Sequence, residues 1–405
     1  MNVFDYLMLI NIFLIWSLLF VNIVLIVAGY VYYLKVEKEQ PPEIIGEYPF
    51  VSIMVPAHNE GVVIVKTVAA LLALDYPGDR YEIIVINDNS SDNSAELLKE
   101  IQDSNPNRNL IVINTDKITG GKGKSNALNI GYQQAKGEFI AIYDADNTPE
   151  HKALIYLAAE LKADDSLGAV IGKFRTRNKE VNLLTRFINI ETLSFQWMAQ
   201  AGRWQLMKLC TIPGTNFILR RTIIEAIGGW DEKAVAEDTE ISFRIYLMGY
   251  KIKFQPKAVT WEQEPQTWSV WFRQRTRWVK GNVYVLIKNI GYLVDKDAKK
   301  IRFDIFYFLS TYFLLLTALV VSTSIQGFSN LLWFTAFVMF VLGVFIALTT
   351  EKGEMSVSNF FIIALMYVSY CQMWIIVTVY GVFSYFKDRI KKQDSKWYKT
   401  ERFQG

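Results

Sequence analysis

Histidine and cysteine are scarce in this sequence, and their scarcity excludes several kinds of catalytic chemistry. The 405 residues include two Cys and two His. Cys210 and Cys371 belong to no spaced Cys/His set, so the sequence indicates neither a disulfide framework nor a zinc site. A Ser-His-Asp or Cys-His hydrolase would have to use His58 or His151, and the chain has no G-x-S-x-G elbow. Catalysis is therefore expected to rely on carboxylates, of which the chain has 40.

An excess of charge of one sign is also missing. The chain has 43 Lys and Arg residues against 40 Asp and Glu residues, which gives a formal net charge of +3. A nucleic-acid-binding protein would show a concentrated basic patch, so we expect no nucleic-acid partner. The apolar fraction of 51% excludes a disordered chain, because so many apolar residues must be buried.

Three long stretches contain no charged residue, namely residues 6–34, 305–350 and 355–386. A helix needs about 20 apolar residues to cross a bilayer. The sequence therefore predicts an N-terminal transmembrane helix at 6–34, which is too long for a signal peptide, and a C-terminal transmembrane region at 303–386. Lys and Arg residues border the stretch between them, which favours the cytoplasmic side. We predict a multi-pass protein of the plasma membrane with a cytoplasmic domain.

The basic tail at 387–405 conflicts with a simple count of crossings. One span before the domain and three after it would leave this tail outside the cell, although basic segments favour the cytoplasm. Residues 355–386 have polar side chains near their centre, among them Ser369 and Gln372. This segment is therefore the first candidate for a re-entrant or interfacial piece.

Between the apolar stretches, short β-branched runs alternate with segments of helical periodicity. The runs lie at 50–55, 82–86, 110–113, 139–143 and 169–171. The helical segments include 62–72, 95–101 and 124–134. This alternation predicts βαβ units and a mostly parallel sheet covered on both faces, in one α/β domain at 48–260. Ligands of such sheets bind beyond the C-terminal ends of the strands.

Acidic side chains follow three of these expected strands. The first run leads into residues 56–60, which end with Glu60, the second into Asp88, and the fourth into Asp144 and Asp146. The last two lie two residues apart, so in an extended segment they project to the same side and can share a hard cation. Mg²⁺ or Mn²⁺ held by carboxylates and substrate phosphates suits chemistry with a phosphate leaving group. Each motif alone is also typical of turns and helix N-caps.

The glycine-rich residues 120–125 do not have the spacing of a nucleotide loop. A P-loop would need glycine in place of Ile118, and a dinucleotide loop would need it in place of Asn126. We interpret the segment as a flexible basic loop whose Lys122 or Lys124 meets a diphosphate. A merely solvated loop is the alternative.

An acidic pair, Glu237 and Asp238, opens another expected helix. Acidic residues in a first helical turn are favoured by the helix dipole, so this pair also has a purely structural interpretation.

The segment 261–302 is rich in tryptophan, with four such residues between Trp261 and Trp278. At about 100° per residue, Trp268, Trp271 and Trp278 fall within an arc of roughly 80°, and basic residues lie opposite. We predict amphipathic interface helices here, with a tryptophan face and a basic face. Tryptophan also stacks on sugar rings, so the segment has a second possible use. It contains the string Gln274, Arg275, Thr276, Arg277 and Trp278.

The order and spacing of these motifs resemble those of the membrane-embedded family 2 glycosyltransferases that polymerise sugars. These are the synthases of cellulose, hyaluronan and poly-N-acetylglucosamine, and related bacterial β-glucan synthases. The resemblance covers residues 48–285 by motif, and its most specific part is Gln274-x-x-Arg277-Trp278 after a Glu-Asp pair and an Asp-x-Asp. It implies a GT-A (Rossmann-like) cytoplasmic domain inserted between transmembrane helices, a UDP-sugar donor, Mg²⁺ or Mn²⁺ as cofactor, and inversion at the anomeric carbon.

The resemblance also implies roles for individual residues. The uridine would be held by Pro56, Ala57, His58, Glu60 and Asp88, and Lys124 would approach the nucleotide. Asp144 and Asp146 would bind donor and metal, with Asp146 the more direct metal ligand, and Asp238 would be the general base. The other substrate-binding residues implied are Gly214, Thr215, Glu237, Gln274, Arg275, Arg277 and Trp278. His58 departs from the family, which often has an aromatic residue at this position.

We therefore predict a processive enzyme that adds sugar to a growing polysaccharide and passes the product through a channel of its own transmembrane helices. UDP-glucose, giving a β-glucan, is narrowly favoured as donor over UDP-N-acetylglucosamine. The nearest alternative transfers one sugar to a membrane lipid. A transporter with a regulatory domain is disfavoured, because the apolar stretches lack the charges that mark a transport path. The sequence leaves an accessory subunit open.

Overall fold

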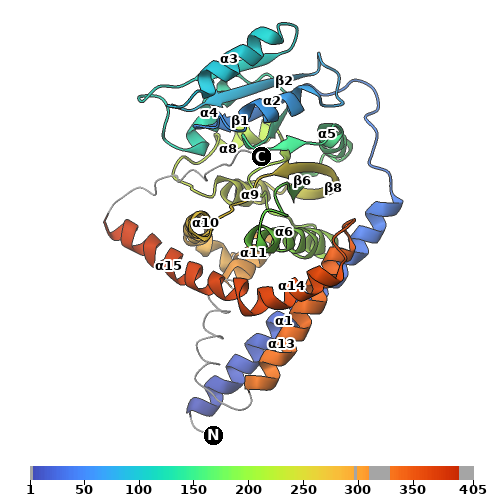
Figure 1. Cartoon of the computed structure of the whole chain (residues 1–405), viewed down its shortest axis with the longest axis vertical. Helices are drawn as coiled ribbons and strands as arrows, with labels where there is room; N and C mark the ends of the chain where they lie inside the picture. Colours follow the sequence, from blue (N-terminus) through green and yellow to red (C-terminus); the bar gives the residue numbers. More distant parts are fainter. Residues whose placement is uncertain (1–2, 296–298, 310–328, 392–405) are drawn as a thin grey trace.

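The computed structural model describes residues 3–295, 299–309 and 329–391 (Figure 1). An α/β domain forms the upper part of the molecule in this view. Below it, α1 (Val3–Lys38) and α13 (Ser329–Thr349) project away from the domain, whereas α14 (Val357–Val368) and α15 (Tyr370–Ile390) run across its base.

One mixed sheet of eight strands organises the domain, in the order β3-β2-β1-β4-β7-β6-β8-β5. The strands are β1 (Val51–Ala57), β2 (Tyr81–Asn87), β3 (Leu110–Asn114), β4 (Phe139–Ile142), β5 (Thr148–Pro149), β6 (Leu167–Thr176), β7 (Phe217–Arg220) and β8 (Lys251–Glu262). β3, β2, β1 and β4 are mutually parallel, as the sequence predicts. Every residue of β2 is buried, which is typical of a strand covered on both faces.

The other half of the sheet corrects the prediction of a mostly parallel arrangement. β7 runs antiparallel to both of its neighbours, β4 and β6, and β5 runs antiparallel to β8. β6 and β8 are parallel to each other. The antiparallel strand β7 places the residues just before Phe217 beside the C-terminal end of β4, because Phe217 pairs with Ile142.

The predicted helices of the domain are present. They are α2 (Ile64–Leu72), α3 (Ser94–Ser104), α4 (Lys124–Gln134) and α9 (Glu237–Leu247), and the chain adds α5 (Ala153–Ala163) and α8 (Arg221–Ile227). α9 begins at the acidic pair, with Glu237 and Asp238 in its first turn. α4 follows Gly123, whose φ of 109° lies in a region that L side chains rarely adopt.

A composite helix connects the domain to α1. α6 (Leu183–Phe195) continues as the π-helix η1 (Gln196–Gly202) and then as α7 (Arg203–Met207). A Cβ on Gly29 would lie 2.0 Å from the carbonyl oxygen of Trp197, and one on Gly202 would lie 2.3 Å from that of Leu25. These two glycines therefore allow α1 and η1 to cross in direct backbone contact.

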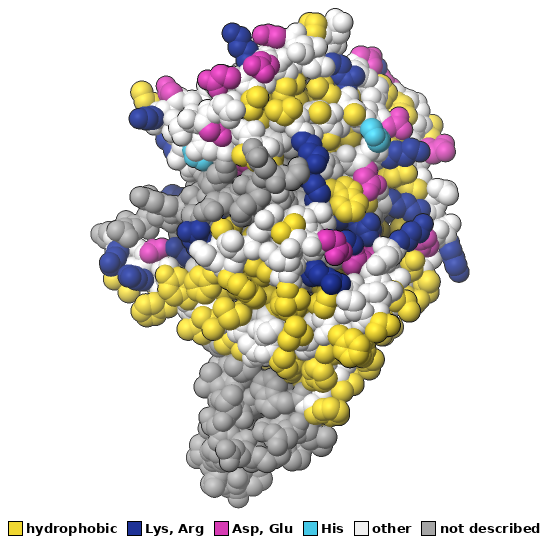
Figure 2. All heavy atoms as spheres, viewed as in Figure 1, with side chains coloured by type: hydrophobic (Ala, Val, Ile, Leu, Met, Phe, Trp, Pro, Cys, Tyr) yellow, Lys and Arg dark blue, Asp and Glu magenta, His cyan; other side chains and the backbone are white. Residues whose placement is uncertain are grey.

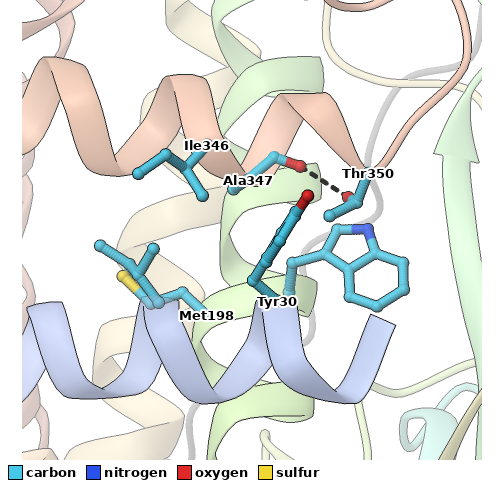
Figure 3. Close-up of a pocket in the computed structure, with 7 residues that line it drawn as sticks. Tyr30, Met198, Ile346, Ala347 and Thr350 are labelled. Atoms are coloured by element: carbon cyan, nitrogen blue, oxygen red, sulfur yellow. Dashed lines mark hydrogen bonds between the residues drawn. The ribbon is translucent and has the colours of Figure 1, made fainter. Parts of the chain in front are cut away.

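The end of α1 is part of the domain as well. The hydroxyl of Tyr32 is buried and donates to the carbonyl oxygen of Phe254 in β8 at 2.6 Å. Figure 3 shows a small apolar pocket where α1, η1 and α13 meet, with Tyr30, Met198 and Ile346 around it. The upper part of α1 thus packs against protein.

Two segments of the described chain are long and apolar enough to cross a membrane, Ile12–Lys38 and Val357–Ile390. Phe334–Thr349 is a shorter apolar helix. The backbone breaks at Ser369, which divides the second segment into α14 and α15. Residues 310–328, on which part of the predicted spans falls, and residues 392–405 of the basic tail lie outside the described residues. The prediction of multiple crossings therefore stays a prediction.

Hydrophobic side chains gather on the lower half of the molecule, over α14 and α15 (Figure 2). Among the exposed ones on these two helices are Phe361, Val368 and Phe383. Charged side chains lie mainly on the α/β domain above them.

The tryptophan-rich segment forms α10 (Trp268–Asn289), followed by the short η2 (Ile290–Leu293) and α11 (Lys299–Leu309). Trp268 and Trp278 are 44% and 40% exposed, but Trp271 is fully buried. Its indole N–H donates to the hydroxyl of Tyr370 on α15 at 2.9 Å. The three tryptophans therefore do not form one exposed face, because α15 covers Trp271, and the interfacial placement of this helix stays a prediction.

Candidate active site

The ends of β1 and β2 are joined to each other. Nδ1 of His58 lies 2.6 Å from the carbonyl oxygen of Asp88, so this nitrogen carries the proton. The backbone N–H of Asn59 donates to Ser90 Oγ at 2.8 Å, and that of the buried Glu60 donates to Ser94 Oγ at 3.0 Å. The structure thus brings together the two segments for which a uridine site is predicted.

The glycine-rich loop lies against the same strand end. Oδ1 of Asp88 accepts hydrogen bonds from Thr115 Oγ1 and from the backbone N–H of Gly121, both at 2.9 Å. A Cβ on Gly120 would lie 2.3 Å from this oxygen, so the close approach requires glycine. The backbone of this loop therefore binds the carboxylate of Asp88.

The loop before β7 is bound to the end of β4. Thr215 Oγ1 accepts the backbone N–H of Asp144 at 2.9 Å and donates to Asn147 Oδ1 at 2.5 Å. Asp146 is buried, and its Oδ2 accepts the backbone N–H of Gln263 at 3.3 Å. The predicted acceptor-site residues and the Asp-x-Asp therefore share one edge of the sheet.

Lys124, the first residue of α4, joins three of these segments. Its Nζ lies 2.7 Å from Asp144 Oδ1 and 3.2 Å from Glu237 Oε1, and it donates to the carbonyl oxygen of Gly214 at 2.7 Å. Burial alone would lower the pKa of the Lys124 ammonium, but the carboxylates of Asp144 and Glu237 outweigh it and raise that pKa above its ordinary value. The Lys124 ammonium therefore stays protonated between these two carboxylates.

Asp238 lies beside this ion-paired lysine. Burial raises the pKa of Asp238 to about 7, Glu237 contributes in the same direction, and Lys124 and Arg277 act against them. The backbone N–H of Thr239 donates to Asp238 Oδ1 at 2.7 Å. A carboxyl group that titrates near neutral pH has the pKa that general-base catalysis at physiological pH requires.

α10 holds the beginning of α9 in place. A Cβ on Gly281 would lie 2.6 Å from Ala236 Cβ, so glycine allows α10 to touch the residue before the acidic pair. Lys288 lies 2.7 Å from both Glu240 and Asp231. The position of Asp238 therefore depends on the helix that carries the Gln274–Trp278 string.

The members of that string lie in different surroundings. Arg277 is close enough to Asp238 to lower its pKa, and Trp278 is partly exposed. Gln274 is buried, and its Oε1 accepts from Arg275 Nη1 at 3.2 Å. Arg275 is 1% exposed, and its Nη2 pairs with Glu191 Oε2 at 2.8 Å. Arg275 is thus held inside the protein.

A family model described as "Glycosyltransferase like family 2" matches residues 49–281, which is more than half of the chain. The chain belongs to glycosyltransferase family 2. It is 48% identical over 409 residues to Probable glycosyltransferase YdaM of Bacillus subtilis (strain 168), with 97% of both chains covered. It is 32% identical over 282 residues to Poly-beta-1,6-N-acetyl-D-glucosamine synthase of Staphylococcus aureus (strain COL), covering 68% of this chain and 66% of that protein.

The solved structures support the same fold. Mannosyltransferase PcManGT from Pyrobaculum calidifontis, in complex with GDP-Man and Mn²⁺, matches with a TM-score of 0.63 and 21% identity, over 91% of this chain and 99% of that chain. This family 2 glycosyltransferase therefore has a GT-A-like fold with a mixed sheet, and the prediction that it is a glycosyltransferase enzyme is confirmed.

The Asp-x-Asp of this glycosyltransferase offers oxygen ligands for a divalent cation. Among the described residues, no group of three or more His, Cys, Asp and Glu side chains could hold a metal ion by itself. Two carboxylates fit a site whose other ligands are donor phosphates and water. One oxygen of Asp144 contacts Lys124 and one oxygen of Asp146 accepts the backbone N–H of Gln263, so the prediction that Asp146 is the more direct metal ligand stays a prediction.

Sequence reasoning missed two kinds of residue in this glycosyltransferase. Asn147 is fully buried and binds Thr215, although it directly follows the Asp-x-Asp and could have been included with it. Glu191 lies in the middle of α6 and belongs to no motif, so only the structure reveals its contact with Arg275.

Proposed function

We propose that this glycosyltransferase is a processive, inverting enzyme of the membrane that polymerises a sugar from a UDP-sugar. The observation that carries the proposal is the ion-paired Lys124, which joins Asp144 and Glu237 beside Asp238. A donor phosphate group requires fixed positive charge, and an acceptor hydroxyl requires a base. Both requirements are met within one cluster of side chains.

The donor site in this proposal lies at the strand ends. Residues 56–60 and Asp88 bind the uridine, and Lys124 and Arg277 face the diphosphate. Asp144 and Asp146 hold Mg²⁺ or Mn²⁺, which when bound stabilises the charge on the leaving diphosphate. The hydrogen bond from His58 to Asp88, and that from Gly121 of the glycine-rich loop to Asp88, give this site a fixed shape.

Transfer is a single displacement in this proposal. Asp238 accepts the proton of the acceptor hydroxyl while the oxygen of that hydroxyl attacks the anomeric carbon of the donor sugar. The bond from this carbon to the diphosphate oxygen breaks, and its electron pair leaves with UDP. One displacement inverts the anomeric configuration and needs no covalent enzyme intermediate. Gly214, Thr215, Gln274 and Trp278 bind the acceptor sugar.

The donor sugar is proposed on the basis of the relatives. The family resemblance described in the sequence analysis narrowly favours UDP-glucose and a β-glucan product. The 32% identity to a protein named poly-β-1,6-N-acetyl-D-glucosamine synthase favours UDP-N-acetylglucosamine instead. We therefore propose UDP-N-acetylglucosamine as the first donor to test and UDP-glucose as the second.

The membrane arrangement forms the third part of the proposal. α1 and the two spans predicted within 305–350, of which α13 is the second, cross the bilayer, and α14 and α15 lie along its cytoplasmic surface. The support is that both ends of the α14–α15 segment contact the α/β domain or α10: Glu354, just before α14, pairs with Lys179 at 2.6 Å, and Asp388 pairs with Lys280. A segment held at both ends on one side makes no net crossing. The basic tail then stays in the cytoplasm, which removes the conflict in the count of crossings.

Donor turnover tests this proposal directly. The full-length protein, purified in lipid vesicles with Mg²⁺ or Mn²⁺, is incubated with a panel of UDP-sugars, and the UDP released is measured. One UDP-sugar, N-acetylglucosamine before glucose, is expected to be consumed much faster than the others. Turnover of none of them would contradict the UDP-sugar assignment.

A further inference from the structure

The carboxylate of Glu191, on α6, receives hydrogen bonds from two other helices. Arg275 Nη2 on α10 donates to Oε2 at 2.8 Å, and the hydroxyl of Tyr370 on α15 donates to the same oxygen at 2.7 Å. The indole N–H of Trp374, also on α15, donates to Oε1 at 2.6 Å. One side chain thus links α6, α10 and α15.

Arg275 in turn contacts two members of the candidate substrate-binding string. Its Nη1 donates to Gln274 Oε1 at 3.2 Å, and its guanidinium carbon lies 3.8 Å from the centre of the Trp278 ring. Arg275 is 1% exposed, whereas Trp278 is 40% exposed. A planar guanidinium stacks well on an indole, so a buried cation fixes the orientation of a ring that solvent and substrate can reach.

The position of Arg275 depends on the charge of Glu191. A buried guanidinium needs a carboxylate partner, and Glu191 is the one within ion-pairing distance among the described residues. The ring of Trp374 lies 5.7 Å from the guanidinium carbon and packs on Arg275 as well. Without the charge of Glu191, we expect the guanidinium to shift toward water, which would change its contacts with Gln274 and Trp278.

We propose that Glu191 is a positioning residue for sugar transfer. Through Arg275 it holds Gln274 and Trp278 in the orientation that binds the acceptor sugar, and the hydrogen bonds from Tyr370 and Trp374 hold the Glu191 carboxylate in place. Glu191 itself does not touch the substrate. The inference rests on the proposed function, because it assigns the acceptor side of that site. It also replaces the expected substrate contact of Arg275 by an indirect role.

An ion pair between α10 and α15, two of the three helices that Glu191 links, provides a matched control. Lys280 pairs with Asp388 near the far end of α15. This pair joins the same two helices, but neither residue is bonded to Arg275, Gln274 or Trp278 in the described structure. Loss of helix docking alone would therefore give the same result in Asp388→Asn as in Glu191→Gln.

The test compares these variants in the full-length protein in lipid vesicles. Two rates are measured with the UDP-sugar that the wild type uses, namely total UDP release and sugar incorporated into product. Glu191→Gln is expected to lower incorporation by about 10- to 100-fold, because a misplaced acceptor reacts poorly. UDP affinity and slow hydrolysis of the donor by water should remain, so the incorporated fraction falls. Asp388→Asn should keep this fraction within twofold of wild type.

Two further variants separate positioning from folding. Arg275→Lys keeps a charge opposite Glu191 but loses the several N–H donors and the planar shape of the guanidinium that stacks on Trp278. It should therefore lower the incorporated fraction as Glu191→Gln does. The double variant should be no worse than either single one, because both act through the same contact. The inference would be overturned if Arg275→Lys incorporated the same fraction of sugar as the wild type. It would also be overturned if this fraction fell equally in Glu191→Gln and Asp388→Asn. If the wild type releases no UDP from any donor, the proposed function fails instead.

Discussion

A Cβ atom on Gly214 would lie 2.9 Å from Oδ2 of Asp238, so the loop before β7 touches the candidate base directly. The carbonyl oxygen of Gly214 also accepts a hydrogen bond from Lys124 at 2.7 Å. Its φ of 91° lies in a region that L side chains rarely adopt. A single glycine thus borders both the base and the lysine of the proposed site.

Gly214→Ala is expected to lower the transfer rate about tenfold or more, because a displaced catalytic group loses its reactive geometry. The strained backbone adds a loss of about 1–3 kcal/mol in the free energy of unfolding. Gly249→Ala is the control, since Gly249 has a φ of 84° but nothing within 4 Å of its Cβ position. It should lose stability and keep activity. Equal activities of the two variants would show that the contact with Asp238 does not matter.

Asp238→Asn is expected to abolish transfer while UDP binding survives. The amide keeps the shape of the carboxylate but cannot accept the proton, and a general base contributes about 10²- to 10⁴-fold in rate. UDP affinity is measured by calorimetry and transfer by sugar incorporation. Asp165→Asn is the matched control, because the Asp165 side chain is 99% exposed. Substantial polymerisation by Asp238→Asn would exclude Asp238 as the base.

The transfer rate is expected to rise with pH through about 7. Burial first, and the Glu237 carboxylate second, raise the pKa of Asp238 to about 7, and the protonated form below this pH cannot act as a base. Glu237→Gln removes the like charge, so the pKa of Asp238 falls and the acidic limb of the profile moves to lower pH. Profiles of kcat/KM against pH for both proteins check this. If the acidic limb of Glu237→Gln stays at the same pH or moves to higher pH, this prediction is contradicted.

Excess EDTA is expected to abolish transfer, and added Mg²⁺ or Mn²⁺ should restore it. Asp146→Asn should raise the metal concentration needed for half-maximal activity, because Asp146 is the proposed direct ligand and one oxygen of Asp144 already contacts Lys124. Calorimetry of Mn²⁺ binding in the presence of UDP gives a second readout. Transfer that continues unchanged in EDTA would refute the metal role of both aspartates.

Sequence reasoning predicted the first half of the sheet because its strands carry a strong local signal. β2 is a continuous buried run, and α4 has the predicted bounds, Lys124–Gln134. β7 has only four residues and runs antiparallel between β4 and β6. Nothing in so short a run indicates its direction, so the mixed character of the sheet emerges only in three dimensions.

The candidate site also has a part that the sequence predicts and a part that only the structure shows. Asp88, Asp144 and Asp146 could be expected to share an edge because parallel strands end together. The bond from Lys124 to Gly214 spans 90 residues, and those of Glu191 to Arg275 and Trp374 span 84 and 183 residues. Such contacts depend on tertiary packing. Sequence motifs identify residues by their local spacing and therefore do not predict them.

The most direct test of the proposed function is the size of the product. The full-length protein in lipid vesicles is given its preferred UDP-sugar with a radioactive label, and the product is sized on a gel and digested with linkage-specific hydrolases. We predict a long polysaccharide that forms in the wild type and is absent in Asp238→Asn. A single labelled sugar on a lipid, or UDP release without any labelled product, would contradict a processive synthase.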